Sequence, residues 1–208
     1  MRENAKTLRR AAIQDFKRQS ILDAAERVFL ERGLDGATVR SIAKAAGCAT
    51  GTVYLYFDGK EAIYAALLGD SLDRLKAAVA KAVEEARKDP SQAERALRAF
   101  FDYYQSQPKE LDLGLYLFQG VEPRGLSKAL DKQLNDQLTD VVSLLAECLR
   151  QSKDIAQADA WNIVLSLVSH MVGCLILENT GRLAVMGGDA RQIIDQRLEE
   201  ILARSIDS

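Results

Sequence analysis

Apolar residues recur at steps of three and four along nearly the whole chain, which is the spacing of one face of an α-helix. Alternating apolar and polar runs between Asn-Gly or Asp-Gly turns, the pattern of a β-hairpin, are absent from the sequence. The three prolines, Pro90, Pro108 and Pro123, fall where apolar stripes stop, so they mark boundaries between helices. The sequence therefore predicts an all-α protein.

The chain is long enough to fold without a stabilising metal or disulfide. Its 208 residues are 48% hydrophobic, which suits one large globular domain or two small ones and excludes a disordered chain. Residues 1–60 contain 11 Lys and Arg against 7 Asp and Glu, a net charge of +4, whereas the remainder carries −6. A basic head on an acidic body favours a polyanionic partner for the head, although a chance fluctuation of surface charge would give the same count.

No motif for a metal, a cofactor or catalysis is present. Cys48, Cys148 and Cys174 are far apart and the chain has one histidine, so we expect neither a zinc site nor a disulfide framework. Ser166 lies one helical turn before His170, but no nucleophile elbow accompanies them, so a histidine that is packed or at an interface is expected. We therefore expect no cofactor, no metal and no enzymatic activity.

The same features point to a protein of the cytoplasm. Scattered cysteines suit a reducing compartment, and the basic N-terminus lacks the apolar run of a secretory signal. The apolar stretch at 160–177 is interrupted by polar residues, which favours a buried helix of a soluble protein over a membrane span.

Three short helices and one long helix are expected in the first third of the chain. The first carries an apolar face over 21–29 and ends near Arg32, because Gly33 suits a left-handed C-terminal residue. Thr38 can cap the second helix, and Gly47 breaks it.

The remaining helices follow from similar signals. A third helix runs to about Phe57, and Asp58 and Glu61 have the spacing of a capping box at the start of the fourth. Further helices follow the prolines, one occupies about 156–179, and the last begins after Asp189, which can cap it.

Two short helices joined through Gly47 have the form of a helix-turn-helix, unless they are two ordinary core helices. Gly51 favours the first interpretation, because a glycine near a helix start costs up to ~1 kcal/mol relative to alanine. Such a glycine is better explained where a backbone approaches a ligand closely. The outward face of the second helix consists of Thr50, Gly51, Thr52, Leu55 and Tyr56.

Residues 21–68 read ILDAAERVFLERGLDGATVRSIAKAAGCATGTVYLYFDGKEAIYAALL and resemble the DNA-binding head of the tetracycline-repressor (TetR) family. The resemblance rests on ERG, T-x-x-x-I-A, Gly47, Gly51 followed by VY and YF, and Lys60-Glu61. The chain departs from the common pattern at Cys48 and in its longer N-terminal arm. The resemblance implies a dimeric one-component regulator whose C-terminal helices bind a small effector.

The resemblance and the side-chain chemistry together predict a set of DNA contacts. Tyr54, Tyr56 and Lys60 match family positions that hold phosphates, and such contacts read no sequence. The hydroxyls of Thr50 and Thr52 would enter the major groove, where threonine can donate, accept or pack its methyl on thymine. The full predicted set is Thr38, Arg40, Lys44, Ala49, Thr50, Gly51, Thr52, Tyr54, Tyr56 and Lys60.

The role of several other residues in the basic part of the chain stays open. Arg40 could reach a guanine or a phosphate, and Lys44 is either a phosphate contact or a solvated charge. Cys48 is either a small packed residue or a redox switch. The arm is either a disordered solubilising tail or a contact to the minor groove or phosphates. Its cations are Arg2, Lys6, Arg9, Arg10, Lys17 and Arg18.

Two further sites are expected in the body. An effector pocket, unless the aromatic stripe is plain core, would be lined by Phe100, Phe101, Tyr104, Leu115, Tyr116, Phe118 and Gln119. A four-helix dimer interface would involve Trp161, Val164, Leu165, Val168, Met171, Val172, Leu175, Ile194, Leu198 and Ile201.

These expectations define three segments and one function. Residues 1–19 form the arm, 20–66 the helix-turn-helix domain, and 67–208 the effector-binding and dimerisation domain. The expected function is a transcriptional repressor that a small molecule releases from a palindromic operator in double-stranded DNA. The alternative is a helical adaptor that keeps the head fold but binds proteins.

Overall fold

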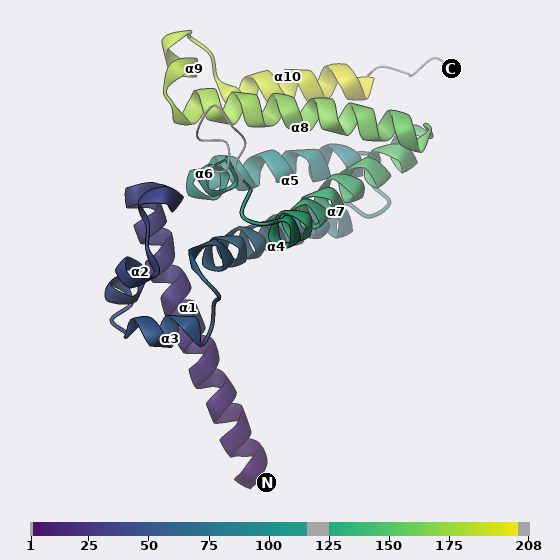
Figure 1. The fold of residues 1–208 in the computed structure, drawn as a ribbon. Helices are drawn as coiled ribbons and strands as arrows, with labels where there is room; N and C mark the ends of the chain where they lie inside the picture. Colours follow the sequence, from purple (N-terminus) through teal and green to yellow (C-terminus); the bar gives the residue numbers. More distant parts are fainter. Residues whose placement is uncertain (1, 116–124, 204–208) are drawn as a thin grey trace. The chain divides into compact units, whose positions relative to one another are not determined.

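The computed structural model describes residues 2–115 and 125–203, and every regular element within these ranges is a helix (Figure 1). The predicted all-α class is therefore confirmed. The chain divides into two compact units, residues 1–70 with 114–134 and residues 71–113 with 135–208. The first unit contains the expected head, and the predicted boundary after residue 66 falls inside a helix.

The first unit is built on a long helix, α1 (Arg2–Gly36), against which α2 (Val39–Ala45) and α3 (Thr50–Tyr54) lie (Figure 1). The predicted end of the first helix near Arg32 is confirmed, because the regular helix breaks at Gly33, which has a φ of 68°. A short second helical stretch follows that kink and runs to Gly36. The N-terminal arm is helical as well, since α1 begins at Arg2, so a disordered tail does not describe it.

The core of the head forms where α1 meets the start of α4 (Lys60–Glu85). The ring of Phe29 packs edge-on against that of Tyr64, with 5.4 Å between the ring centres. Buried aliphatic side chains from α1, α2 and α3 complete this core: Ile21, Leu22, Ala25, Ile42 and Val53. The apolar stripe at three-four spacing thus fixes the rotation of α1 about its own axis.

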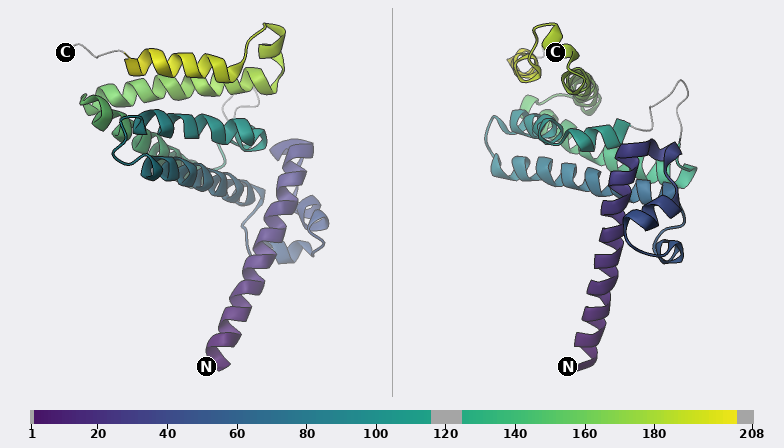
Figure 2. Two further views of the ribbon diagram at one scale, coloured as in Figure 1. Left: turned by 180° about the vertical axis from the view of Figure 1, so that it is seen from behind. Right: turned by 90° about the vertical axis from the view of Figure 1, so that its left-hand side faces the viewer.

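The second unit contains α5 (Gln92–Ser106), α8 (Gln157–Asn179), the short α9 (Arg182–Val185) and α10 (Ala190–Ala203). The helices α8 and α10 run side by side in both views of Figure 2. The carboxylate of Asp189 accepts a hydrogen bond from the backbone N–H of Gln192 at 2.8 Å, which confirms the predicted cap.

Three helices link the units along the chain, namely α4, α6 (Pro108–Leu115) and α7 (Lys128–Lys153). Within the second unit, α7 is tied to α4 by an ion pair between Lys76 and Asp140 at 2.7 Å. Leu138 was expected in the inner stripe of α7, but it is 40% exposed.

The helix α8 is apolar on two sides. Its side toward α5 and α10 is buried in the second unit and carries Ala160, Val164, Leu167, Met171, Cys174 and Leu175. By length and composition α8 could cross a membrane, with a mean hydropathy of 1.9, as core helices of soluble proteins also could.

Candidate nucleic-acid interface

The helix-turn-helix is held by backbone geometry on both sides of α2. Thr38 Oγ1 accepts a hydrogen bond from the N–H of Ser41, and Ser41 Oγ accepts one from the N–H of Thr38, both at 3.0 Å. This capping box satisfies backbone donors that the helix start leaves free. At the other end Gly47 has a φ of 67°, which an L-residue rarely adopts, so the chain turns there into α3.

The helix α3 has an inner and an outer face. Val53 is fully buried and Phe57, just beyond the helix, is 7% exposed, so both anchor α3 to the head. Tyr54 is 56% exposed and Leu55 is 81% exposed on the outer side. These two neighbouring side chains leave the outer side of α3 open for contact with a partner.

Among the residues that the structure describes, none would clash with a side chain at Gly51. This glycine lies in α3 with a φ outside the left-handed region, and a Cβ added there would meet no atom within 4 Å. An alanine would favour the helix by up to ~1 kcal/mol. With no side chain at this position, a partner could approach the backbone of α3 closely.

Two predicted DNA contacts are already engaged within the head. The hydroxyl of Thr38 is occupied in the capping box. Lys60 Nζ donates a hydrogen bond at 2.8 Å to the carbonyl oxygen of Leu34, near the end of α1. Lys60 therefore fastens α4 to α1, a role that its sequence position did not indicate.

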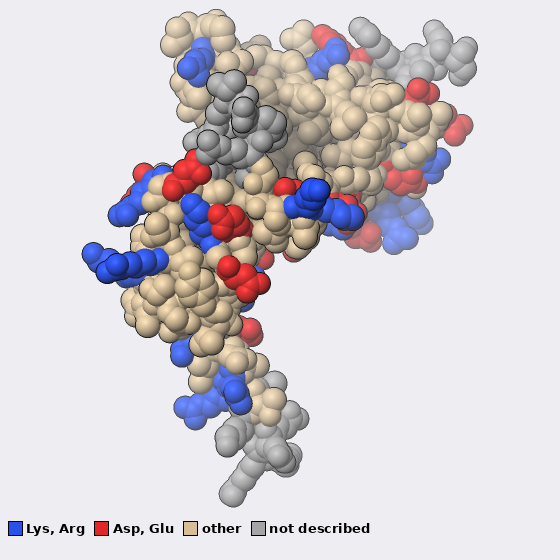
Figure 3. Space-filling view, viewed as in Figure 1, with Lys and Arg blue, Asp and Glu red and all other residues tan. Residues whose placement is uncertain are grey.

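The other predicted DNA contacts are accessible on the head. Arg40, Lys44, Ala49 and Gly51 are exposed, while Thr50, Thr52 and Tyr56 are half-buried. In the space-filling view, blue Lys and Arg side chains lie over the head and its helical extension, interspersed with uncharged surface and with some red Asp and Glu side chains (Figure 3). This pattern suits a polyanion contacted by a largely uncharged reading helix and by cations around it.

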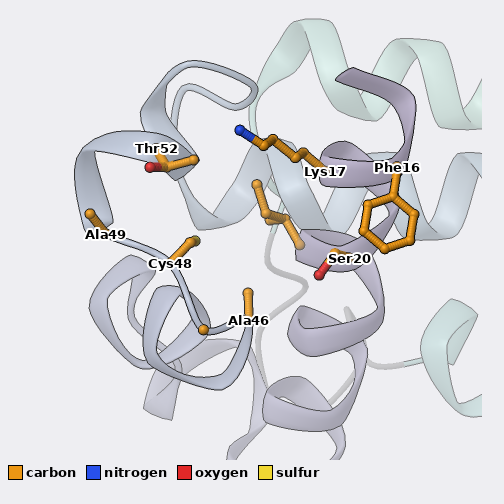
Figure 4. A pocket seen from close by; sticks show the side chains of 9 residues that line it. Phe16, Lys17, Ser20, Ala46, Cys48, Ala49 and Thr52 are labelled. Carbon is orange, nitrogen blue, oxygen red and sulfur yellow. The ribbon is translucent and has the colours of Figure 1, made fainter. Parts of the chain in front are cut away.

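A groove of about 350 Å³ separates α1 from the turn between α2 and α3. Phe16, Lys17, Ser20 and Ile21 line one wall, and residues 46–49 with Thr52 line the other. The Lys17 side chain extends toward the side of Thr52, while Phe16 points another way (Figure 4). The sequence argument missed this groove, although the helical spacing of the arm could have placed Lys17 and Ser20 on one face.

Some of the residues expected to line an effector pocket are buried in the core, and others lie outside the residues that the structure describes. Phe100 and Phe101 are each 1% exposed, and the ring of Phe100 packs edge-on against Tyr104 at 5.3 Å. Burial raises the pKa of the Tyr104 hydroxyl. Leu115 is half-buried. The remaining members, Tyr116, Phe118 and Gln119, lie outside the described residues.

The expected dimer interface needs a correction. Five of its members are 1% exposed or less in the single chain and pack in its own core, where a second copy cannot touch them: Val164, Met171, Leu175, Ile194 and Leu198. The side of α8 away from this core still carries apolar side chains that are half-buried or exposed: Trp161, Leu165, Val168, Val172 and Ile176. Ile201 on α10 is half-buried, and Ser166 and His170 are exposed on α8.

The head matches known proteins in sequence. The family model of bacterial regulatory proteins, tetR family, matches residues 21–67. The transcriptional repressor KstR2 of Rhodococcus jostii is 46% identical over 59 residues, which are 28% of this chain and 29% of that protein. The chain thus spans about a third of the length of relatives that match over the head, such as the regulator YvdT of Bacillus subtilis.

Longer likenesses are weaker in sequence. The nicotine-responsive repressor HdnoR of Paenarthrobacter nicotinovorans is 24% identical over 76% of this chain and 81% of that protein. The structure of a regulator from Pseudomonas aeruginosa superposes with a TM-score of 0.72 at 23% identity, covering 91% of this chain and 92% of that one. The FadR regulator of Bacillus subtilis, solved with stearoyl-CoA, gives 0.68 at 21% identity over 91% and 99%. These structures show that the two-part helical fold is shared.

Proposed function

We propose that the chain, whose residues 21–67 match the model of bacterial regulatory proteins, tetR family, is a cytoplasmic DNA-binding transcriptional repressor released from its operator by a small molecule. The observation that carries this proposal is the outer face of α3. That face combines an exposed Leu55 with a glycine at which an added Cβ would meet no atom of the described residues within 4 Å. A major groove is the kind of surface that a short exposed helix of this shape enters.

The proposed contacts divide into two kinds. Thr50 and Thr52 read base edges, and Gly51 lets the backbone approach the groove. Tyr54, Tyr56, Arg40 and Lys44 hold phosphates around the groove, since hydroxyls and cations can bind a phosphate oxygen without reading sequence. Thr38 and Lys60 support this surface from within the head, through the capping box and the bond to Leu34.

A homodimer supplies the second half-site contact. The outer stripe of α8, defined by Trp161, Leu165, Val168, Val172 and Ile176, repeats at steps of three and four over 161–176 of one helix. Gly173 lies close by with open space at its Cβ position, so a second backbone can approach there. Two copies joined through this stripe place two heads on a palindrome.

The effector binds the helical body and shifts the spacing of the two heads. Two relatives suggest the first probes: stearoyl-CoA, present in the B. subtilis FadR structure, and nicotine, to which HdnoR responds. An effector that binds the folded body raises the melting temperature, because the stabilisation grows with the logarithm of its concentration relative to Kd. It should also lower operator affinity, whereas a molecule that raises only the melting temperature is no effector.

The test of the proposed function is selection of bound duplexes from a random-sequence pool, since the operator is not known. Enrichment of an inverted repeat with half-site centres one helical turn apart, about 34–36 Å, supports the proposal. Enrichment of no sequence, together with binding that does not weaken with salt, would instead support the adaptor hypothesis.

A further inference from the structure

We propose that the N-terminal extension of α1, residues 2–19, is a second DNA-contacting element that binds backbone phosphates beside the recognition helix. This inference rests on the proposed function and deepens it. The extension is a continuous helix with the rest of α1, so its cations stand at defined angles about the helix axis.

The rotation of the extension is fixed by contacts at its base. The guanidinium carbon of Arg18 lies 5.5 Å from the centre of the Phe57 ring, a cation–π contact that ties the extension to the segment after α3. Ile21 and Leu22, on the following turn, are 2% and 0% exposed in the core of the head. Lys17 lies one turn before Ile21 and therefore on the same side of α1, so this side of the extension continues the face that turns toward the head.

The cations on this side follow one another toward the N-terminus. Lys17 lines the groove whose other wall contains Thr52, from the recognition helix. Arg10 lies seven residues before Lys17, almost two full turns, so it falls on nearly the same side of α1, and Arg9 lies next to it. Arg9, Arg10 and Lys17 are all exposed. The basic face thus continues out of the groove that α3 borders.

DNA is the partner that this charge arrangement fits. The recognition segment from Ala49 to Asp58 contains no Lys or Arg, so the phosphates around the bound groove need cations from elsewhere. Arg40 and Lys44 on α2 supply two. The cations of the extension, next to the start of α3, supply the others.

An anionic membrane is the competing partner. Ile13 is 48% exposed and Phe16 is 76% exposed among these cations, and a basic helix with apolar side chains can lie on a lipid surface. The position of Lys17 in the groove beside α3 favours DNA, because α3 is the helix proposed to enter the major groove and Lys17 would then lie near its phosphates.

The experiment compares salt dependence on a selected 30-base-pair duplex, about three helical turns. The variant Arg9→Gln/Arg10→Gln/Lys17→Gln is measured against the wild type and against Arg87→Gln/Lys88→Gln/Lys109→Gln, which removes the same charge from exposed sites elsewhere. The slope of log affinity against log salt should become shallower by about 0.9 for each phosphate that the variant no longer neutralises, and only in the first variant. The charge-conserving variant Arg9→Lys/Arg10→Lys/Lys17→Arg should keep the wild-type slope.

Ethylation interference identifies the phosphates concerned. Ethylation of certain phosphates should weaken binding of the wild type but not of the Gln variant of the extension. Ethylation around the base pairs that α3 contacts should weaken binding of both proteins. An unchanged slope and an unchanged interference pattern in that variant would overturn the proposal, as would a loss confined to binding of phosphatidylglycerol vesicles. Failure of the proposed function looks different, because the wild type would then select no duplex at all.

Discussion

The ammonium group of Lys60 donates a hydrogen bond to the carbonyl oxygen of Leu34 over 2.8 Å, joining the first residue of α4 to the last turns of α1. The acceptor lies one residue after the kink at Gly33, where the backbone of α1 leaves regular helical geometry. Lys60 thus joins α1 and α4, the helices that precede α2 and follow α3 in the chain.

Replacing this ammonium should lower the stability of the head. We expect Lys60→Met to reduce the free energy of unfolding by about 1 kcal/mol, because the Leu34 carbonyl loses a charged donor in a half-buried place. Chemical denaturation followed by circular dichroism measures this change. Lys60→Arg keeps a donor and should lose less, and Lys44→Met, at an exposed site of α2, is the matched control. If the Lys60→Met protein is as stable as the wild type but binds DNA weakly, Lys60 contacts a phosphate directly and does not stabilise the head.

The dimer proposal separates two glutamate substitutions on the same helix. Leu165, 40% exposed on the outer stripe of α8, should tolerate Leu165→Glu as a folded monomer, because the charge faces water once the partner leaves. Met171 is 0% exposed, so Met171→Glu places a carboxylate in the core and should unfold the second unit. Light scattering with circular dichroism distinguishes the two. Val185→Glu, at an 88% exposed site of α9, should stay dimeric, and a dimeric Leu165→Glu protein would move the interface to another face.

The three cysteines should differ in reactivity toward iodoacetamide. Cys148 and Cys174 are buried, and burial raises the pKa of both thiols, so less of the reactive thiolate is present at neutral pH. Cys48 is half-buried at the turn before α3 and lines the groove. Mass spectrometry at pH 7.5, a working value near neutrality, should show Cys48 alkylated first. Equal rates at all three sites would show that the second unit opens on the timescale of labelling.

The parts of the fold that the sequence predicted are those set by local chemistry. The Thr38 cap, the turn at Gly47 and the Asp189 cap each depend on one residue type at one place, and all three are present. The capping box proposed for Asp58 was wrong, because α4 begins at Lys60 and Gly59 precedes it. The carbonyl of Gly59 accepts from the N–H of Ile63, the first bond of that helix.

The parts that the sequence could not predict depend on which elements meet in space. Met171 and Leu165 are both apolar residues of one helix, and only the packing of α5 and α10 against α8 shows which of them is already covered. The arm lacks an apolar stripe of its own, so periodicity did not mark it as a helix. It is helical because it is rich in good helix formers and prolongs a helix that the head has nucleated.

The central claim is that the outer face of α3 enters a groove of DNA, and Gly51→Leu tests it most directly. A side chain added at Gly51 meets no atom of the chain within 4 Å of its Cβ, and leucine favours the helix, so the folded head should be at least as stable. The measurement is a fluorescence anisotropy titration of the selected duplex, with Ala80→Leu, at an exposed site of α4, as the control. We predict that Gly51→Leu loses at least tenfold in affinity, about 1.4 kcal/mol, while Ala80→Leu binds as the wild type does. Wild-type affinity in a folded Gly51→Leu protein would contradict the account.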